Sequence, residues 1–416
     1  MEKCIIVISH SNYLIRSAGI EKFISETSAL LNSKGIHVLQ VFPLIEVNRK
    51  LPYDYIGINF DDYFLGVYSE AHLFETLTSI GKSKNLRILG IDIHQIHGWN
   101  LHYLKKALVK LNLPINCFVH DHELVSADSL LDSSDGHTKK VIQQRDPKNC
   151  YGEANPAIMA EYHDFFDTLY SHIEKVIAPS HIAAYDWENS YPIFKDKMVI
   201  REHLYRTMLE LKRSSEVSDP MRIAYLGTPA KHKGYDEWKT FVSTMQSDNH
   251  YSFYYFGKQE QHIPNVKDVH VDFQNPDSLP MTDQLMKHNI DIVFLWSICR
   301  ETYCYTYYEA EAASCYILTN NESGNIQAQV KTDETGCIFT SLEQCLEWLS
   351  NTTNVKKTIA QYRASHKLES LSPNSNIDDL LFKHPGNLNY SGQKRIRSYK
   401  SFILTNVYRI LRGAQR

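Results

Sequence analysis

The sequence predicts an α/β protein with two doubly wound domains, each built on a parallel sheet. Short apolar runs alternate with longer amphipathic stretches from the first residues onward, which is the rhythm of such a sheet. The same alternation starts again near residue 221. A length of 416 residues and an apolar content of 43% suit two ordered domains and exclude a disordered or low-complexity chain.

The first domain opens with a strand, a helix and a second strand. Residues 4–8 and 38–42 are short, mainly apolar runs, as expected for strands of a parallel sheet. Between them, residues 19–33 carry apolar side chains at steps of three and four, and a lysine and a glycine mark the helix end. Further strands are expected at 86–93, 115–119 and 175–178. We assign residues 1–200 to this domain.

The second domain begins after a polar and charged stretch, residues 201–219, which we interpret as a linker. A fresh apolar run at 221–226 ends on Gly227. Further strands are expected at 251–256, 269–273, 290–295 and 316–319. We place this second parallel-sheet domain at 220–375.

A basic tail, residues 376–416, completes the chain. Its last part, 394–416, holds seven Lys or Arg and no acid, with apolar residues at helical spacing. Such a helix suits an anionic membrane surface. Docking of its apolar face on the first domain is an equal alternative.

Charge and hydropathy exclude other classes of protein. A net charge of -4 argues against nucleic-acid binding. No apolar run approaches the roughly 18–20 residues that cross a bilayer, and the N-terminus lacks the features of a signal peptide. The eight cysteines form no CxxC pair and are expected to be reduced. We expect a cytoplasmic protein that can lie peripherally on the inner face of the plasma membrane.

The strongest local signal follows the apolar run at 291–295. Glu301 and Glu309 stand eight residues apart, so a helix that begins shortly after Glu301 lets both acids border one surface. The backbone N–H groups of Tyr303, Cys304 and Tyr305 would then lie at the helix N-terminus, where phosphates bind. On spacing alone, two solvated acids are the alternative.

This segment, read with the alanines at 312–313, the apolar run 317–319 and Gly324, resembles the signature of glycosyltransferase family 4, the retaining nucleotide-sugar enzymes of GT-B fold. The resemblance covers the chain up to about residue 375. It implies two Rossmann-like domains that face a cleft, with Glu301 at the donor sugar and Glu309 at the ribose. A carboxylate suits the ribose because it can accept hydrogen bonds from both hydroxyls.

The segment from Gly227 to Gly234 resembles the family's first loop of the second domain. The resemblance places Lys233 at the diphosphate, where a fixed cation stabilises the leaving group. The family usually has an arginine after the first glycine, whereas this chain has Thr228, and Lys231 is the expected substitute. A solvated lysine-rich turn is the alternative.

Two segments of the first domain also resemble the family. Residues 9–11 and 16–23 are similar to its glycine-rich loop and the following helix, with Gly19 letting a ligand approach the backbone. His120 with Asp121 resembles the family's His-Asp pair, in which the histidine reaches the donor sugar. A turn glycine and a structural histidine are the alternatives.

Asp92, His94 and His97 suggest a metal site at first sight, because one acid and two histidines fall within six residues. No fourth ligand is apparent, and the stretch resembles one that borders the acceptor side in polysaccharide-building relatives. We therefore assign His94 and His97 to the acceptor side and predict no metal.

Together these features predict a metal-independent, retaining hexosyltransferase without a cofactor, with Glu301, His120 and Lys233 as catalytic residues. The expected donor is a UDP-sugar and the acceptor a glycan or lipid-linked precursor of a surface polysaccharide. Ser314 and Tyr316 stand where relatives have Gly and Pro, which predicts either an altered donor wall or a chain that binds without catalysing. The alternatives are a non-catalytic GT-B-like subunit that binds a partner glycosyltransferase or a glycan and, last, a sugar-nucleotide epimerase.

Overall fold

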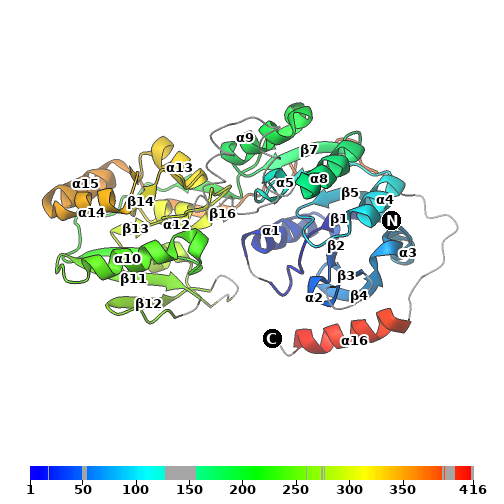
Figure 1. Ribbon diagram of the computed structural model, residues 1–416, viewed down its shortest axis with the longest axis horizontal. Coiled ribbons are helices and arrows are strands. Elements are labelled where there is room, and N and C mark those ends of the chain that lie inside the picture. Colours follow the sequence, from blue (N-terminus) through cyan, green and yellow to red (C-terminus); the bar gives the residue numbers. More distant parts are fainter. Residues whose placement is uncertain are drawn as a thin grey trace. The chain divides into compact units, whose positions relative to one another are not determined.

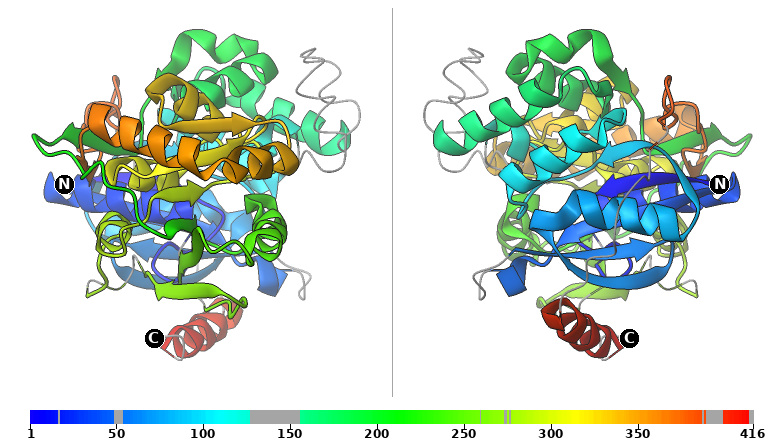
Figure 2. Two further views of the ribbon diagram at one scale, coloured as in Figure 1. Left: turned by 90° about the vertical axis from the view of Figure 1, so that its left-hand side faces the viewer. Right: turned by 90° about the vertical axis from the view of Figure 1, so that its right-hand side faces the viewer.

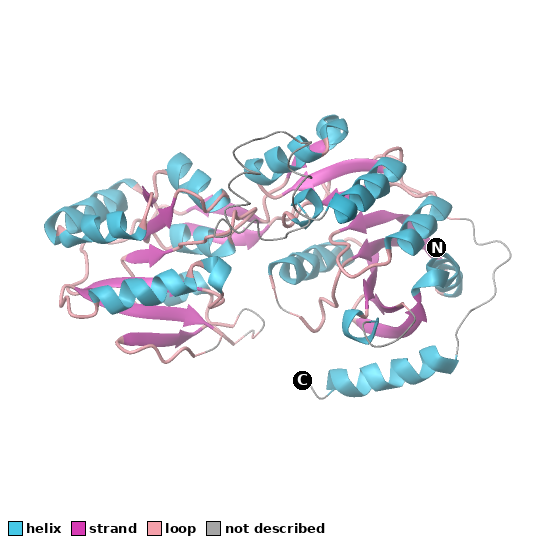
Figure 3. Ribbon diagram, in the orientation of Figure 1, coloured by secondary structure: helices cyan, strands magenta, loops and turns pink. Residues whose placement is uncertain are grey.

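The computed structural model describes residues 1–16, 18–48, 54–126, 156–258, 260–272, 275, 277–386, 388 and 399–413. These residues form two compact units. Unit 1 contains residues up to 120, residues 156–203 and those from 375 onward, and unit 2 contains residues 121–126 and 204–374. Each unit is an α/β body with strands in a central layer and helices beside it (Figures 1 and 3). The prediction of two doubly wound parallel-sheet domains is confirmed.

Unit 1 has an eight-stranded sheet in the order β4-β3-β2-β1-β5-β6-β7-β8. Its strands are β1 (Glu2–Ile8), β2 (Ile36–Pro43), β3 (Tyr55–Phe60), β4 (Tyr63–Ser69), β5 (Leu86–Ile93), β6 (Ile115–Phe118), β7 (Ile173–Ala178) and β8 (Met198–Ile200). All neighbours are parallel except β2 with β3 and β3 with β4. The antiparallel hairpin β3-β4 was not predicted.

The helices of unit 1 connect these strands, except for α16, which follows the last strand of the chain. They are α1 (Gly19–Ser33), α2 (Ile45–Asn48), α3 (Leu73–Ser83), α4 (Leu101–Leu111), α8 (Pro156–Leu169), α9 (His181–Ser190) and α16 (Tyr399–Gly413). Helix α1 has the predicted bounds, because Phe23, Ile24 and Leu31 form an apolar stripe that is buried against the sheet. This places the first turn of α1 at the carboxyl end of β1.

Unit 2 has a six-stranded, wholly parallel sheet in the order β12-β11-β10-β13-β14-β15. Its strands are β10 (Met221–Leu226), β11 (Tyr251–Gly257), β12 (Val266–His270), β13 (Ile292–Phe294), β14 (Tyr316–Asn320) and β15 (Gly336–Phe339). Its helices are α5 (Glu123–Ser126), α10 (Tyr235–Met245), α11 (Met281–Lys287), α12 (Tyr305–Ala312), α13 (Asn325–Asp333), α14 (Leu342–Ser350) and α15 (Thr352–Ser365).

Strand β12 corrects one prediction. A strand was expected at 269–273, but β12 ends at His270, and Phe273 lies outside the described residues. The strand is only partly buried, and Val271 N donates to Gly257 O just beyond it. The first residues of this edge strand are mainly polar, whereas apolar residues alternate with polar ones at 269–273, so the prediction was placed too far along the chain.

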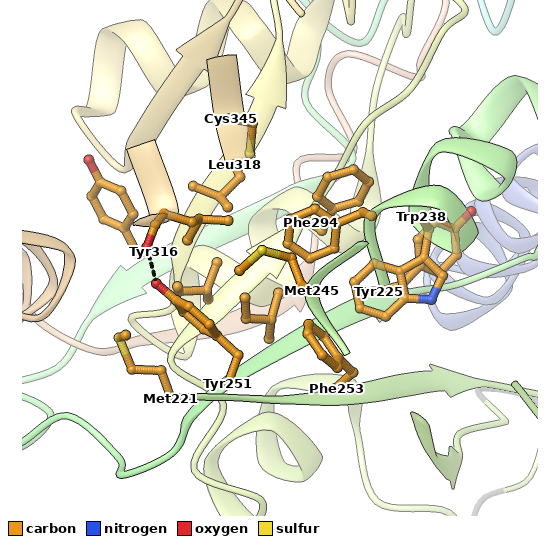
Figure 4. Close-up of a cluster of buried hydrophobic side chains, with 14 of the residues drawn as sticks. Met221, Tyr225, Trp238, Met245, Tyr251, Phe253, Phe294, Tyr316, Leu318 and Cys345 are labelled. Atoms are coloured by element: carbon orange, nitrogen blue, oxygen red, sulfur yellow. Dashed lines mark hydrogen bonds between the residues drawn. The ribbon is translucent and has the colours of Figure 1, made fainter. Parts of the chain in front are cut away.

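An aromatic core supports the central strands of unit 2 (Figure 4). Trp238 of α10 packs between the side chains of Phe253 and Phe294, with ring centroids 6.1 and 5.6 Å away. Tyr225 of β10 packs on the same tryptophan. The Tyr225 hydroxyl also donates to Thr228 O at 3.0 Å, so this core holds the loop that follows β10.

The stretch predicted as a linker, 201–219, has regular structure in part. Strand β9 (Leu204–Met208) pairs antiparallel with β16 (Glu369–Pro373) in a separate two-stranded sheet. Farther along, the buried Arg213 donates to Ile290 O at 2.6 Å and Ala313 O at 3.1 Å. After β16 the chain returns to unit 1, where Leu380 and Phe382 pack in the core.

Both sheets have a topological switch point. In unit 1, strands β2 to β4 are added on one side of β1, and strands β5 to β8 are added on its other side. In unit 2 the same reversal occurs between β10 and β13. Loops that leave the carboxyl ends of two such strands diverge, and ligands of open α/β sheets bind there.

Candidate functional site

The unit 2 switch point brings together two predicted residues. Lys233 ends a 3₁₀ turn (Lys231–Lys233) in the loop after β10, and Glu301 lies in the loop after β13. Lys233 Nζ lies 2.6 Å from Glu301 Oε1. The two residues are 68 positions apart in the sequence, so the sheet order creates this ion pair.

In this ion pair Glu301 is buried and Lys233 is partly exposed to solvent. Glu301 is 6% exposed, and its Oε1 also accepts from Ser297 Oγ at 2.8 Å and Cys299 Sγ at 3.6 Å. The Lys233 side chain is 39% exposed. Burial alone would lower the pKa of Lys233, but the Glu301 carboxylate outweighs it and raises that pKa above its usual range. Lys233 is therefore a cation at neutral pH that a ligand can still reach.

Backbone contacts fix Glu301 in place. Gly324 has a φ of 63° and forms a parallel bridge with Glu301. Asn325 N donates to Glu301 O at 2.8 Å. A Cβ at position 324 would lie 2.6 Å from both the N and the O of Glu301, so only glycine fits.

The loop after β10 is locked to the loop after β13 as well. His232 O accepts from Ile298 N at 3.1 Å, and the Ser297 hydroxyl that donates to Glu301 also lies 3.0 Å from this oxygen. Gly234 has a φ of 74°, and a Cβ there would lie 2.0 Å from Trp296 O. These contacts set the position of the Lys233 backbone, and the Tyr225 hydroxyl adds a bond to Lys233 O at 3.3 Å.

Helix α12 begins at Tyr305, four residues after Glu301, with Cys304 as the N-cap and Tyr303 just before it. Its first turn lies beside the end of β10, because a Cβ on Gly227 would meet Thr306 Cγ2 at 3.5 Å. Burial raises the pKa of Cys304 to about 11 and that of Cys299 to about 12, so both stay protonated thiols. Neither is suited to act as a nucleophile.

Glu309 and Glu311 of α12 have different environments. Glu309 is half-buried, whereas Glu311 is buried and pairs with Arg206 at 2.7 Å. Arg206 NH1 also lies 3.3 Å from Asp333 Oδ2. The sequence did not predict this cluster, because Arg206 lies in the presumed linker. Lys231, the expected substitute for the family's arginine, is exposed on the same turn as Lys233.

The unit 1 switch point gathers histidines. His94 follows β5 and His120 follows β6, and His94 Nδ1 lies 3.0 Å from His120 Nε2. The His94 ring stacks on Phe118 with centroids 4.2 Å apart. The buried His203 was not predicted, and its ring centroid lies 6.1 Å from that of His120. His97 is exposed, whereas His94 is buried.

These imidazoles are held neutral. Burial lowers the pKa of His120 to about 3, with His10 adding repulsion. Burial also lowers the pKa values of His94 and His203 well below the usual range. One nitrogen of His94 and one of His120 are used in their mutual hydrogen bond, so each ring keeps one further nitrogen that can donate to or accept from a sugar hydroxyl.

A second unpredicted group lies at the end of β1. Glu21, in the first turn of α1, is buried and accepts from Ser11 Oγ, with His10 Nε2 at 3.4 Å. Gly19 precedes it and is exposed, and a Cβ at this position would meet no atom within 4 Å. The fold does not require glycine there, in contrast to Gly234 and Gly324.

No protein-family model matches this sequence, and no curated protein does. Solved structures match its fold. Sucrose-phosphate synthase from Thermosynechococcus elongatus aligns with 99% of this chain and 100% of its own, at a TM-score of 0.53 and 10% identity. The chain has the GT-B fold. A glycosyltransferase from Rickettsia africae ESF-5 aligns at a TM-score of 0.50 and 13% identity, over 88% of this chain and 94% of its own.

Ser314 and Tyr316, which stand where relatives have Gly and Pro, lie away from the loops of the candidate site. Ser314 and Tyr316 were expected to shape the donor wall. They lie at the amino end of β14, whereas the loops that carry Lys233 and Glu301 leave the carboxyl edge of the sheet. Tyr316 packs in the aromatic core, 5.9 Å from Trp348 between ring centroids, and Ser314 has a φ of 51°. Both residues therefore serve the fold.

The GT-B units contain no metal centre among the residues that the structure describes, where no three His, Cys, Asp or Glu side chains are placed to hold an ion. Asp92 instead accepts from Asn116 Nδ2 at 3.1 Å. Burial raises the pKa of Asp92 to about 7. Within the same residues, no helix has both the length and the apolar character to cross a bilayer.

Proposed function

We propose that this chain is a glycosyltransferase that uses a nucleoside-diphosphate sugar as donor. The Lys233–Glu301 pair at the unit 2 switch point carries the proposal. The GT-B fold supports it, since a sucrose-phosphate synthase and a glycosyltransferase share that fold. A UDP-sugar is the expected donor, and a glycan or lipid-linked precursor of a surface polysaccharide is the expected acceptor.

Lys233 supplies the positive charge for the diphosphate. Its ammonium has three N–H donors, and Glu301 takes one of them. The others are available to phosphate oxygens on the exposed side of the lysine. Negative charge grows on the diphosphate as the sugar leaves, and a cation already in place stabilises it without reorganisation. The first turn of α12, with Tyr303, Cys304 and Tyr305, adds the positive end of a helix dipole.

Glu301 has two roles in this proposal. It holds Lys233 in position before the donor arrives, and it accepts hydrogen bonds from hydroxyls of the donor sugar. Glu309, half-buried on α12, binds the ribose hydroxyls. In unit 1, we expect the neutral imidazoles of His94 and His120 to bind sugar hydroxyls.

Transfer proceeds with retention, as the family resemblance implies. The bond between the anomeric carbon and the diphosphate oxygen breaks, and its electron pair leaves with the nucleoside diphosphate. The acceptor hydroxyl oxygen forms the new bond on the same face, and its proton passes to the departing phosphate oxygen. In this scheme the protein positions the reactants and stabilises charge, and it forms no covalent intermediate.

A non-catalytic GT-B-like subunit is the second candidate. Thr228 favours it, because the loop after β10 then carries one cation fewer than the family pattern. The solvent exposure of Lys233 argues against a non-catalytic subunit, because a diphosphate can reach this cation.

Thermal-shift measurements with UDP, GDP, ADP and CDP test the donor site. A ligand at 100 times its dissociation constant adds about 2.7 kcal/mol of stability, which is a shift of several degrees. Stabilisation by one diphosphate that Glu309→Ala abolishes is the expected result. If no diphosphate shifts the wild type, the non-catalytic subunit replaces the proposal.

A further inference from the structure

Helix α16 docks on unit 1 through a mixed polar and apolar side, on which Leu404 and Tyr408 pack against an apolar cluster of unit 1. Ser401 and Thr405 are buried, and Thr405 Oγ1 accepts a hydrogen bond from Val67 N of β4 at 2.9 Å. Asn12 Nδ2 donates to the Tyr408 hydroxyl at 3.2 Å. The Tyr408 ring lies 4.6 Å from that of Phe64 between centroids. The views in Figures 1 and 2 agree on this place for α16, next to β3 and β4.

The other side of α16 exposes large apolar side chains. Phe402, Ile403, Val407 and Ile410 are between 45% and 72% exposed. At about 100° per residue, these four positions fall within an arc of roughly 140°. We call this arc the apolar face of α16. An amphipathic helix on a soluble domain normally buries such a face, so its outward orientation calls for an occupant.

Positive charge borders the apolar face. Lys400 and Arg409 are both exposed and lie at its two edges by the same helical geometry. Beyond Asp379 the sequence has no Asp or Glu, while Lys and Arg recur to its end. A basic border around an apolar stripe complements an anionic lipid surface.

We infer that the apolar face of α16 inserts into the interface of an anionic phospholipid bilayer while the helix stays docked on unit 1. A second copy of this chain is disfavoured as occupant, since pairing two such faces would bring like charges together. Docking and membrane contact then act on opposite sides of one helix and do not exclude each other. The inference rests on α16 alone and does not depend on the proposed function.

Sedimentation of the full chain with vesicles tests this inference. Vesicles of phosphatidylcholine with phosphatidylglycerol should bind the wild type, and pure phosphatidylcholine should bind it at least tenfold more weakly. The double variant Val407→Ser/Ile410→Ser should lose at least tenfold in binding to the anionic vesicles. Met208→Ser/Leu211→Ser is the matched control, because these side chains are 70% and 64% exposed and lie outside α16. It should bind as the wild type does.

Three outcomes would overturn the inference. They are a wild type that ignores anionic vesicles, a double variant that binds equally well, and a self-association of the wild type that the double variant loses. If the double variant unfolds, Phe402→Trp replaces it. The fluorescence emission maximum of the new tryptophan should shift to shorter wavelength when anionic vesicles are added. An unchanged emission maximum would equally contradict insertion. The diphosphate thermal shift should be the same in Val407→Ser/Ile410→Ser and wild type, so the two proposals fail separately.

Discussion

His94 Nδ1 and His120 Nε2 lie 3.0 Å apart at the carboxyl edge of the unit 1 sheet, each at the end of a different strand. A hydrogen bond at this distance needs one ring to donate and the other to accept. Two imidazolium rings could not form it. The pair therefore depends on the neutrality that burial imposes.

Stability should depend on pH through these histidines. The pKa of His120 is lowered to about 3 in the folded protein, against about 6.5 in the unfolded chain. The unfolded chain thus binds more protons between these values, and stability falls as the pH drops below about 6.5. Urea unfolding from pH 7 to pH 4 should show this loss, and His120→Phe should flatten it. His97→Phe, at an exposed position, should leave the pH dependence unchanged.

Lys233→Ala should lower sugar transfer by about a hundredfold, the typical effect of losing one charge-stabilising donor. Lys231→Ala is the matched control on the same turn and should cost much less, because Lys231 does not pair with Glu301. Initial rates with a radiolabelled UDP-sugar, or with the donor that the thermal shift identifies, measure both. Equal losses in the two variants would refute the assignment of the diphosphate to Lys233.

Glu301→Gln should also reduce transfer. The substitution keeps the shape of the side chain but removes the charge that holds Lys233 and the capacity of a carboxylate to accept from sugar hydroxyls. Product formation from the donor and a lipid-linked acceptor measures the effect. Wild-type rates in Glu301→Gln would show that this acid has no part in catalysis.

The three glycines near the candidate sites should respond differently to alanine. Gly234→Ala and Gly324→Ala should each destabilise unit 2 by roughly 1–3 kcal/mol or more, because a Cβ would collide with backbone at both places. Gly19→Ala should keep the unfolding midpoint and weaken ligand binding, because the Cβ meets only open space. Denaturant midpoints and diphosphate titrations separate the two effects. A destabilised Gly19→Ala would assign that glycine to the fold.

Arg206→Ala should destabilise unit 2 by about 2 kcal/mol. Removal of one partner from a buried ion pair costs roughly 3–5 kcal/mol, and the arginine is partly exposed, which reduces the loss. Arg206→Ala/Glu311→Gln should recover part of it, because the buried Glu311 is then no longer left with an unpaired charge, although Asp333 still loses its contact with Arg206. A double variant less stable than Arg206→Ala would contradict this explanation.

Periodicity alone located the elements that are fully buried. Helix α1 and strand β10 have the bounds that their apolar patterns predict, because α1 buries one apolar stripe and every residue of β10 except Arg222 is buried. The hairpin β3-β4 escaped prediction, and β12 was predicted three residues too late in the chain. Their pairing depends on neighbouring strands, and β12 is only partly buried.

The sequence indicated several residues of the candidate sites, but it did not predict which of them lie in contact. Lys233 and Glu301 each follow a strand, yet their contact requires that β10 and β13 be neighbours, which local sequence does not specify. Glu21 gave one local signal, an acid in the first turn after the β1 loop. Arg206 gave none, since its partner Glu311 lies 105 positions away.

The bond from Val67 N to Thr405 has a further consequence. β4 is the edge strand of its sheet, and an uncovered edge offers unpaired N–H and C=O groups to strands of other molecules. Helix α16 shields this edge, so a chain truncated before residue 399 should become prone to intermolecular strand pairing. In a truncated chain, aggregation could not be distinguished from a loss of lipid binding. Substitutions on the apolar face of α16 keep the edge of β4 covered and test lipid binding alone.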